Sequence, residues 1–349
     1  MDNDKTMKMF HHMLKGEEIA KGYCLRTKMN MKDPVKCLRD PVFFRSKVNV
    51  PHARTKDQYK AYPTYDFACP IVDSLEGITH CLRTVEYHDR NALYWWVQEK
   101  LGLPKVKIYD YSRLAMISTV LSKRHLRTFV ENGIVDGWGD PRFPTVQGIM
   151  RHGMTIEALK RFMLEQGPSR NTNFQEWDKI WAINKDVIDP TCPRYTGLVN
   201  PVKVILENYE NDTFVEGRTQ PLHPKSQDVG TKVVYYSKEI LIEREDAEMI
   251  AEGEKITLMK WGNCHITSKI GEGDSLVLTG KIDETDKDFK KTKKLTWLSA
   301  NQGLNLKVTL VEYDHLITKK KVEEDEKVAD FINPKSKISY DAIVENSIK

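Results

Sequence analysis

The chain has 349 residues, of which 40% are hydrophobic and 30% are charged, and its formal net charge is +4. This length exceeds the usual size of one domain, so we expect two or three domains with sizeable cores. So small a net charge neither identifies nor excludes a nucleic-acid-binding protein, because such binding depends on a local basic surface. The six cysteines form no CxxC pair and no zinc-finger spacing with histidine, so we expect reduced thiols and no metal site, zinc included.

Membrane and repeat proteins are disfavoured by the sequence pattern. No apolar run approaches membrane-spanning length, and residues 1–20 lack the apolar core of a signal peptide. No internal repeat or low-complexity tract argues for a solenoid or a disordered effector. We therefore expect a folded cytoplasmic protein with no membrane partner.

Short apolar runs alternate with helical patterns in the first half of the chain. Residues 62–102 indicate a buried segment, a helix-and-strand passage, and a helix through Tyr94, Trp95 and Val97 that ends at Gly102. A second strand is expected within residues 106–124. This alternation is typical of a βαβ unit.

A basic cluster stands where the next helix is expected to begin. Ser122 is a good N-cap, because its hydroxyl can accept a hydrogen bond from a free backbone N–H. Four basic residues follow it directly: Lys123, Arg124, His125 and Arg127. The positive end of the helix dipole disfavours such cations by roughly 0.3–1 kcal/mol each, unless an anion offsets them. A phosphate group would suit as that anion, but the residues alone favour a solvated basic turn.

Two more helices are predicted before the chain changes class. Thr155 should cap the first, which Gly167 ends. Its predicted core face comprises Ile156, Leu159, Phe162 and Met163. Pro190 ends the second helix, whose predicted packed face comprises Trp177, Ile180, Trp181 and Asn184. We interpret the two tryptophans as core residues rather than base-stacking platforms, because they fall on the period of a packed face.

From about Val199 onward the pattern is almost entirely that of strands. Apolar and polar residues alternate within residues 201–209, 231–244, 255–267, 275–282, 294–299 and 306–317. Leu306, Val308 and Leu310 show the alternation best, and predict a half-buried strand. Several such strands separated by turns predict antiparallel barrels, which often bind nucleic acid on their loops.

Four stretches together resemble one known family. They are residues 62–91, "YSRL" before "VLSKR" in residues 111–124, "GWGDPRFPTVQGIMRHGMT" in residues 137–155, and "WDKIWAINKDVIDP" in residues 177–190. Their order and spacing are similar to those of the cytosolic, eukaryotic-type glutamyl-tRNA synthetases. These are class I aminoacyl-tRNA synthetases that share their architecture with the glutaminyl enzymes.

The resemblance implies an α/β fold followed by an all-β fold. Residues 1–55 would end an acceptor-binding insertion, and residues 56–125 would form the second half of a Rossmann-type catalytic fold. Residues 126–198 would be a helical stem-contact region. Residues 199–349 would form antiparallel anticodon-binding β-barrels, incomplete at the C-terminus.

The resemblance also implies a nucleotide site. Val120 to Arg124 match the family's KMSKS-type loop, which grips ATP phosphates during adenylate formation. The residues implied to bind ATP, taken as its Mg²⁺ complex, are Arg113, Leu114, Val120, Leu121, Ser122, Lys123 and Arg124. Of these, Lys123 and Ser122 are assigned to catalysis, because such transfers depend on positioning and on neutralising spread negative charge.

Three further residues match positions that contact the amino acid or the tRNA. Tyr65 matches a residue that holds the amino acid, and Arg83 matches the position that faces the end of its side chain, where a guanidinium would pair with a γ-carboxylate. An ion pair with Glu86 or Asp89 is the alternative for Arg83. Asp89 matches a contact to the acceptor stem, and capping of the following helix is its alternative.

The implied function is that of a glutamate–tRNA ligase, whose partners are ATP, L-glutamate and tRNA(Glu). Other synthetases, in a multi-synthetase complex, are further implied partners. We find no HIGH-type motif, so we expect a fragment or one part of a divided enzyme, with conditional activity. A glutamine–tRNA ligase is one alternative. A non-catalytic tRNA-binding module or scaffold is the other.

Overall fold

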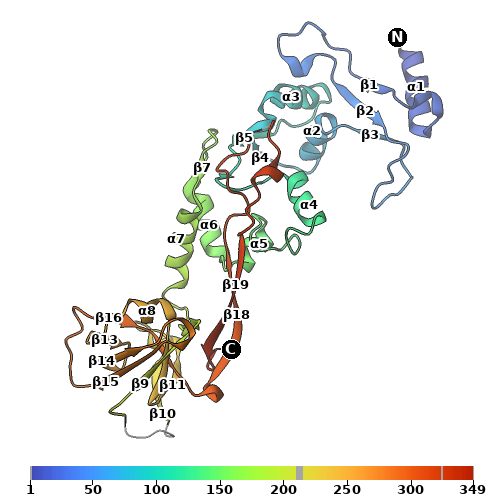
Figure 1. The fold of residues 1–349 in the computed structure, drawn as a ribbon. Helices are drawn as coiled ribbons and strands as arrows, with labels where there is room; N and C mark the ends of the chain where they lie inside the picture. Colours follow the sequence, from blue (N-terminus) through green and yellow to red (C-terminus); the bar gives the residue numbers. More distant parts are fainter. Residues whose placement is uncertain (1, 210–214, 324, 349) are drawn as a thin grey trace. The chain divides into compact units, whose positions relative to one another are not determined.

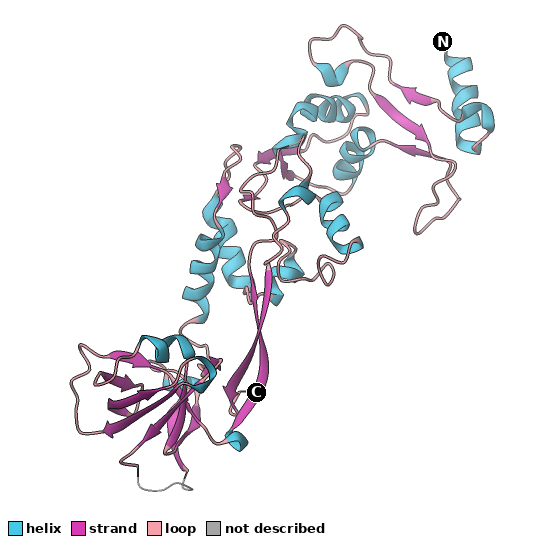
Figure 2. Ribbon diagram, in the orientation of Figure 1, coloured by secondary structure: helices cyan, strands magenta, loops and turns pink. Residues whose placement is uncertain are grey.

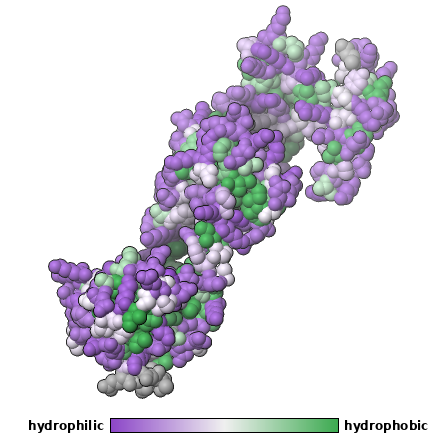
Figure 3. Space-filling model, in the orientation of Figure 1, coloured by the Kyte–Doolittle hydropathy of each residue, from purple (hydrophilic) through white to green (hydrophobic). Residues whose placement is uncertain are grey.

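The structure, a computed structural model, describes residues 2–209, 215–323 and 325–348 (Figure 1). It divides into two compact units, which we call unit 1 (Met1–Ala115 with Gln166–Phe174) and unit 2 (Met116–Glu165 with Gln175–Lys349). Helices and strands are interspersed up to α7, and strands dominate after it (Figure 2). The face drawn in Figure 3 is mostly hydrophilic, with apolar side chains in small groups. Within the described ranges, no helix is long and apolar enough to cross a membrane.

Unit 1 begins with a helix packed on a small antiparallel sheet. The elements are α1 (Asn3–Lys15), β1 (Cys24–Arg26), β2 (Val42–Ser46) and β3 (Ala61–Pro63), with β2 in the middle of the sheet. Met13, Ala20 and Ala61 form its buried core, and the Phe10 and Phe44 rings meet edge to face beside it.

The second part of unit 1 confirms the predicted βαβ unit. Its elements are α2 (Tyr65–Leu75), β4 (His80–Thr84), a 3₁₀ helix (Val85–Arg90), α3 (Asn91–Lys100) and β5 (Lys107–Tyr111). β4 and β5 are parallel and α3 connects them. Tyr94 and Val97 are buried on α3, whereas Trp95 is 37% exposed. Gly102 follows the helix with φ of +63°, a conformation that favours glycine.

Four helices follow, with the short strands β6 (Ala115–Met116) and β7 (Phe174–Gln175) near them. They are α4 (Lys123–Glu131), α5 (Val146–Arg151), α6 (Ile156–Gln166) and α7 (Trp177–Ile188). Thr155 caps α6 as predicted, its Oγ1 accepting from the Ala158 backbone N–H at 3.2 Å. The predicted core face of α6 is wrong in part, because Ala158 and Phe162 are buried whereas Ile156 and Met163 are exposed.

The packed face of α7 also differs from the prediction. Ile180, Ile183 and Asn184 are buried. Trp177 and Trp181 are only half-buried, so the interpretation of both as core residues is wrong. Their rings stack with centroids 6.4 Å apart along one side of a cavity described below.

Seven strands of unit 2 form one sheet in the order β16-β13-β14-β15-β9-β12-β17. Its edge strands, β16 (Lys293–Leu295) and β17 (Trp297–Ser299), are separated in sequence by Thr296 alone. The two edges must therefore lie close together, and the sheet curves nearly into a barrel around one apolar core. The inner strands are β9 (Val202–Leu206), β12 (Glu239–Ile242), β13 (Lys255–Leu258), β14 (Gly262–Ile270) and β15 (Val277–Asp283).

The prediction of purely antiparallel barrels is wrong for this sheet. β13 pairs with β16, and β15 pairs with β9, in parallel register. The remaining pairs of the sheet are antiparallel. Side chains alternate with a period of two in both kinds of strand, so the sequence pattern does not distinguish them.

The remaining strands form two smaller sheets, and a short helix, α8 (Arg244–Met249), joins the barrel. β10 (Glu216–Pro221) pairs with β11 (Thr231–Tyr236), and β19 (Lys337–Glu345) lies between β8 (Gly197–Val199) and β18 (Asn305–Tyr313). The strand predicted within residues 306–317 is present as β18, but its expected burial is wrong, because Leu306 and Leu310 are 44% and 48% exposed. β18 is the edge strand of a narrow ribbon, which has too little neighbouring structure to cover both of its faces.

The segment between β18 and β19 packs against α4 within unit 2. Leu316 and Ile317 from this segment share a buried cluster with Leu126 and Phe129 of α4. The backbone N–H of Ser118, just before α4, donates to the Lys320 carbonyl at 2.8 Å. The loop that leads into α4 is therefore supported from residues about two hundred positions later in the chain.

Candidate functional site

Arg83 lies on β4 with its guanidinium against two aromatic rings. Its Cζ atom is 4.9 Å from the ring centroid of Tyr87 and 4.9 Å from that of Tyr94. Its Nη2 atom donates to Asn91 Oδ1 at 2.6 Å. Its Nε and Nη1 atoms are buried and have no hydrogen-bond partner among the residues that the structure describes. Buried donors of a cation are costly when they are unpaired, so an anionic ligand would stabilise this half-buried guanidinium.

Asp110 is a buried charge next to the half-buried Arg83. The two residues are register partners on the parallel strands β4 and β5, so their side chains leave the sheet on the same face. Asp110 Oδ2 accepts from Asn91 Nδ2 at 3.1 Å and lies 2.6 Å from His88 Nδ1. Asp110 Oδ1 is buried without a partner in the described part of the chain. Asn91 therefore bridges the two opposite charges, which do not pair directly.

Tyr65 belongs to the same cluster, at the beginning of α2. Its ring meets that of Tyr87 edge to face, with centroids 5.1 Å apart. A hydrogen bond with Cys69, together with partial burial, raises the pKa of Tyr65 to about 12. Burial and the hydrogen bond that Tyr87 donates to Asp66 also raise the pKa of Tyr87. Both phenols therefore stay protonated near neutral pH.

The alternatives for Arg83 and Asp89 are both wrong in the structure. Arg83 forms no ion pair in the described ranges, and Glu86 instead lies 3.0 Å from Arg113 Nε. The N-cap position of α3 is Arg90, and no side chain caps that helix. Asp89 is exposed on the preceding 3₁₀ helix, which leaves its carboxylate accessible.

The beginning of α4 is exposed and free of negative charge. Ser122 is the N-cap residue as predicted, but its hydroxyl makes no capping hydrogen bond, so that part of the prediction is wrong. The first turn holds no acidic residue, and the side chains of Lys123 and Arg124 are exposed. Open backbone N–H groups, the helix dipole and two cations are the features that favour a bound phosphate.

The predicted nucleotide residues are divided between the units. Arg113 and the half-buried Leu114 belong to unit 1, whereas residues 120–124 belong to unit 2. Val120 packs against the buried cluster under α4, and Leu121 is 40% exposed. The structure therefore does not bring all seven residues together within one unit.

A hollow of about 650 Å³ lies in unit 1 beside Tyr65. Its lining includes five cations: Lys36, Arg39, Arg45, Lys47 and Arg90. Tyr62 also lines it, and the buried Tyr62 hydroxyl has no partner among the described residues. A basic hollow with tyrosine rings has the chemistry that binds a single-stranded polynucleotide.

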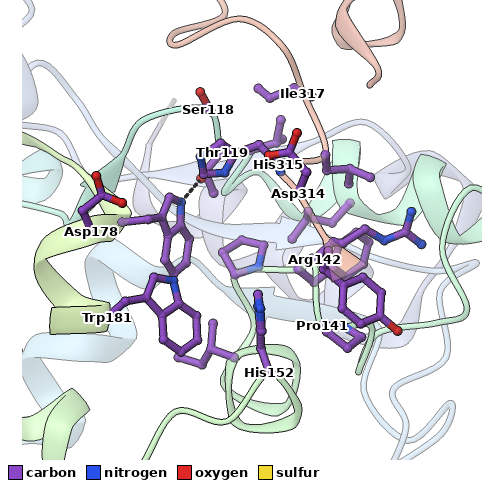
Figure 4. A pocket seen from close by; sticks show the side chains of 18 residues that line it. Ser118, Thr119, Pro141, Arg142, His152, Asp178, Trp181, Asp314, His315 and Ile317 are labelled. Atoms are coloured by element: carbon purple, nitrogen blue, oxygen red, sulfur yellow. Dashed lines mark hydrogen bonds between the residues drawn. The ribbon is translucent and has the colours of Figure 1, made fainter. Parts of the chain in front are cut away.

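A separate cavity of about 210 Å³ lies inside unit 2 (Figure 4). Trp177 Nε1 donates to Thr119 Oγ1 at 2.8 Å on one side of it, and the rings of His152 and Trp181 meet with centroids 4.7 Å apart on another. The sequence did not predict this cavity, because segments far apart in the chain line it.

An ion pair borders the same cavity. The side chains of Arg142 and Asp140 are 6% and 0% exposed, and Arg142 Nη2 lies 2.8 Å from Asp140 Oδ2. Burial alone would raise the pKa of Asp140, but hydrogen bonds from Arg142 and from backbone N–H groups lower it to about 2. This pair anchors the loop between α4 and α5, because Arg142 Nη2 also donates to the Ile134 carbonyl.

Sequence reasoning missed the residues that contact Arg83, namely Tyr87, Asn91 and Tyr94, and its register neighbour Asp110. Asp110 had a weak signal, because it stands between two tyrosines in the strand Lys107–Tyr111, and a carboxylate that is buried in a strand needs a partner. The tyrosines had none, since aromatic residues at helical spacing are ordinary core residues.

Known protein families match almost the whole chain. The catalytic domain of the class I (E and Q) tRNA synthetases matches residues 2–190. Two anti-codon binding domains of the same synthetases match residues 192–283 and 294–349. The chain therefore belongs to the class I (E and Q) tRNA synthetases.

Individual relatives confirm the resemblance to the eukaryotic-type glutamyl enzymes. A cytoplasmic glutamate–tRNA ligase of Arabidopsis thaliana is 49% identical over 99% of this chain and 48% of its own length. Its counterpart in Saccharomyces cerevisiae is 46% identical over 99% of this chain and 48% of its own length. A bifunctional glutamate/proline–tRNA ligase of Mus musculus is 48% identical over 96% of this chain and 22% of its own length. The chain thus spans about half the length of the two cytoplasmic relatives.

Proposed function

We propose that this chain supplies the glutamate-selecting and phosphate-binding part of a cytoplasmic glutamate–tRNA ligase. Such an enzyme activates glutamate with ATP and transfers it to tRNA(Glu). The observation that carries the proposal is the state of Arg83, whose Nε and Nη1 atoms are buried and unpaired among the described residues. The names of the relatives agree with this chemistry.

Arg83 gives the choice between glutamate and glutamine a physical basis. Two parallel N–H donors of a guanidinium match the two oxygens of the γ-carboxylate, and the charges neutralise each other. The amide of glutamine offers one acceptor and leaves the buried cation uncompensated. The glutamine–tRNA ligase alternative is therefore disfavoured at this position.

The beginning of α4 is proposed as the phosphate-binding part. In the activation step the α-carboxylate of glutamate attacks the α-phosphate of ATP and pyrophosphate leaves. Lys123 and Arg124 would neutralise the negative charge that spreads over the phosphates. The Ser122 hydroxyl, which makes no capping hydrogen bond, would donate a hydrogen bond to a phosphate oxygen. Mg²⁺, which accompanies ATP, would supply further charge neutralisation. The described residues contain no group of three or more His, Cys, Asp and Glu that could hold a metal ion.

The tRNA would meet the chain in more than one place. We assign the basic hollow beside Tyr65 to the single-stranded acceptor end, because its terminal ribose must reach the activated amino acid. Asp89 is exposed and caps no helix, so its carboxylate would accept a hydrogen bond from a guanine amino group of the acceptor stem. The barrel and the ribbon of unit 2 are assigned to the anticodon, in line with the families that they match.

The test is glutamate-dependent exchange of pyrophosphate into ATP. It should be run on this chain and on a polypeptide of the relatives' full length, with glutamine as the competing amino acid. Exchange that prefers glutamate over glutamine at least tenfold is expected in the longer polypeptide. A preference for glutamine, or no exchange in the longer polypeptide, would overturn the proposal.

The alternative function is a non-catalytic tRNA-binding module or scaffold, which the anti-codon binding domains that match residues 192–283 and 294–349 would also suit. It predicts tight tRNA binding without any exchange activity in the longer polypeptide. Measuring tRNA binding beside the exchange reaction therefore separates the two functions.

A further inference from the structure

α2 carries two carboxylates that hold the tyrosines around Arg83. Tyr87 donates its hydroxyl to Asp66, and Tyr94 donates its hydroxyl to Asp73 Oδ2 at 2.7 Å. The two aspartates are seven residues apart, close to two helical turns, so they lie on one face of α2. Each ring that contacts Arg83 is therefore fixed at its far end by a charged acceptor.

Asp73 occupies a position that does not suit a carboxylate. It lies two residues before the end of α2 at Leu75, where the helix dipole disfavours negative charge. Besides the Tyr94 hydroxyl it accepts from Cys69 Sγ at 3.4 Å. Cys69 in turn makes a hydrogen bond with Tyr65. Asp73 is therefore linked to tyrosines on both α2 and α3.

Arg83 has a competing partner within the protein. Asp110 Oδ1 is buried and without a partner in the described ranges, and Asp110 is the register neighbour of Arg83. Direct pairing of the two would neutralise the guanidinium before any substrate arrives. The aromatic rings oppose this, because they attract the cation without occupying its N–H donors. Their positions therefore decide whether Arg83 is available.

We propose that Asp73 is a positioning residue for amino-acid selection: by anchoring the Tyr94 hydroxyl, it holds the Tyr94 ring against Arg83 and keeps Arg83 from pairing with Asp110. The inference rests on the proposed function, in which Arg83 receives the γ-carboxylate of glutamate. Asp73 itself contacts neither substrate nor phosphate in this account. Its effect should appear in the affinity for glutamate rather than in the chemical step.

The experiment compares variants in the polypeptide that shows exchange in the preceding test. Tyr94→Phe keeps the ring and removes the hydroxyl that donates to Asp73. Asp73→Asn keeps the shape of the side chain and removes its charge. For each, the ratio of kcat/KM for glutamate over glutamine should fall about tenfold, which corresponds to about 1.4 kcal/mol. The KM for glutamate should carry this change, with kcat within about twofold of the parent.

Two further variants make the result specific. Tyr109→Phe removes a tyrosine hydroxyl that donates to the Pro168 carbonyl at 3.3 Å, on the face of β5 opposite to Asp110, and should leave the ratio unchanged. Adding Asp110→Asn to Tyr94→Phe removes the competing charge and should restore the ratio. Thermal unfolding of each variant shows whether it is folded. If Tyr94→Phe does not fold, the test is made with Asp73→Asn.

The possible outcomes separate this inference from the function on which it rests. If the parent does not activate glutamate, both are overturned. If the parent selects glutamate but Tyr94→Phe and Asp73→Asn keep its ratio within about twofold, the positioning role alone is overturned. A lower melting temperature with an unchanged glutamate-to-glutamine ratio would also overturn the positioning role, because Asp73 would then contribute to stability only.

Discussion

Replacing Arg83 by glutamine is the most direct perturbation of the proposed site. The glutamine side chain is uncharged and could still donate to Asn91, whose Oδ1 now accepts from Arg83 Nη2 at 2.6 Å. The change removes the positive charge and both unpaired donors. The γ-carboxylate of a bound glutamate would then be buried without a counter-charge.

The size of the effect follows from these contacts. Breaking a buried, hydrogen-bonded ion pair by removing one partner costs about 3–5 kcal/mol. Since every 1.4 kcal/mol is about tenfold, kcat/KM for glutamate should fall by at least about a hundredfold. Glutamine carries no charge, so its kcat/KM should change by less than about tenfold. Loss of the two ring contacts should lower the free energy of unfolding by no more than about 2 kcal/mol.

The assay is pyrophosphate exchange with each amino acid, compared between the parent and Arg83→Gln. Arg83→Lys is the matched control, because it keeps the charge and loses the planar pair of donors. It should lie between the parent and Arg83→Gln in its preference for glutamate. A glutamate-to-glutamine ratio that stays within about twofold of the parent in Arg83→Gln would refute the reasoning and leave Arg83 a structural residue.

Three other predictions test the loop, the core and the barrel. Lys123→Ala should slow pyrophosphate exchange by about 10–100-fold, since one charge-assisted contact is worth about 1.5–3 kcal/mol. The dissociation constant for tRNA should stay nearly unchanged. Equal losses in exchange rate and in tRNA affinity would contradict the assignment of Lys123 to the phosphates. The pKa of Asp140 is lowered to about 2 in the folded state, below its unfolded value of about 3.9, so its stabilisation is present above about pH 4 and is lost as the pH falls toward 2. Asp140→Asn should remove this part of the pH dependence of thermal unfolding, and an unchanged acid dependence would exclude it. In Gly280→Ala the new Cβ would lie 2.8 Å from Cys264 Sγ and 2.9 Å from the His265 carbonyl oxygen, so the free energy of unfolding should fall by about 1–3 kcal/mol, as measured by denaturant unfolding.

The sequence could predict the features of the fold that depend on neighbouring residues, such as helix caps and helix ends. Thr155 caps α6, and Gly102 and Gly167 follow their helices with positive φ, as predicted. The βαβ unit was predictable because an apolar run and a helical pattern alternate over short distances. Each of these features depends on residues within a few positions of one another.

Features that depend on distant segments were not predictable. The alternation in Leu306 and Leu310 is that of a half-buried strand, yet both side chains are exposed because β18 lies at the edge of a narrow ribbon. The parallel pairs of the barrel have the same period as antiparallel ones. Trp177 and Trp181 have the spacing of core residues, but a cavity lies beside them. In each case the deciding neighbour is far away in the sequence.

The candidate site shows the same limit in energetic terms. From its sequence neighbours alone, Arg83 could be a structural cation paired with Glu86, but Glu86 lies against Arg113 instead. A structural role would have been satisfied by Asp110, a buried carboxylate in register on the next strand. Instead Asn91 separates the two charges, and tyrosine rings stabilise the guanidinium while its buried Nε and Nη1 donors have no hydrogen-bond partner in the described part of the chain. Rings can hold a cation without neutralising it, so this arrangement costs folding energy that only an incoming anion recovers. That cost is the physical reason to assign Arg83 to a ligand rather than to the fold.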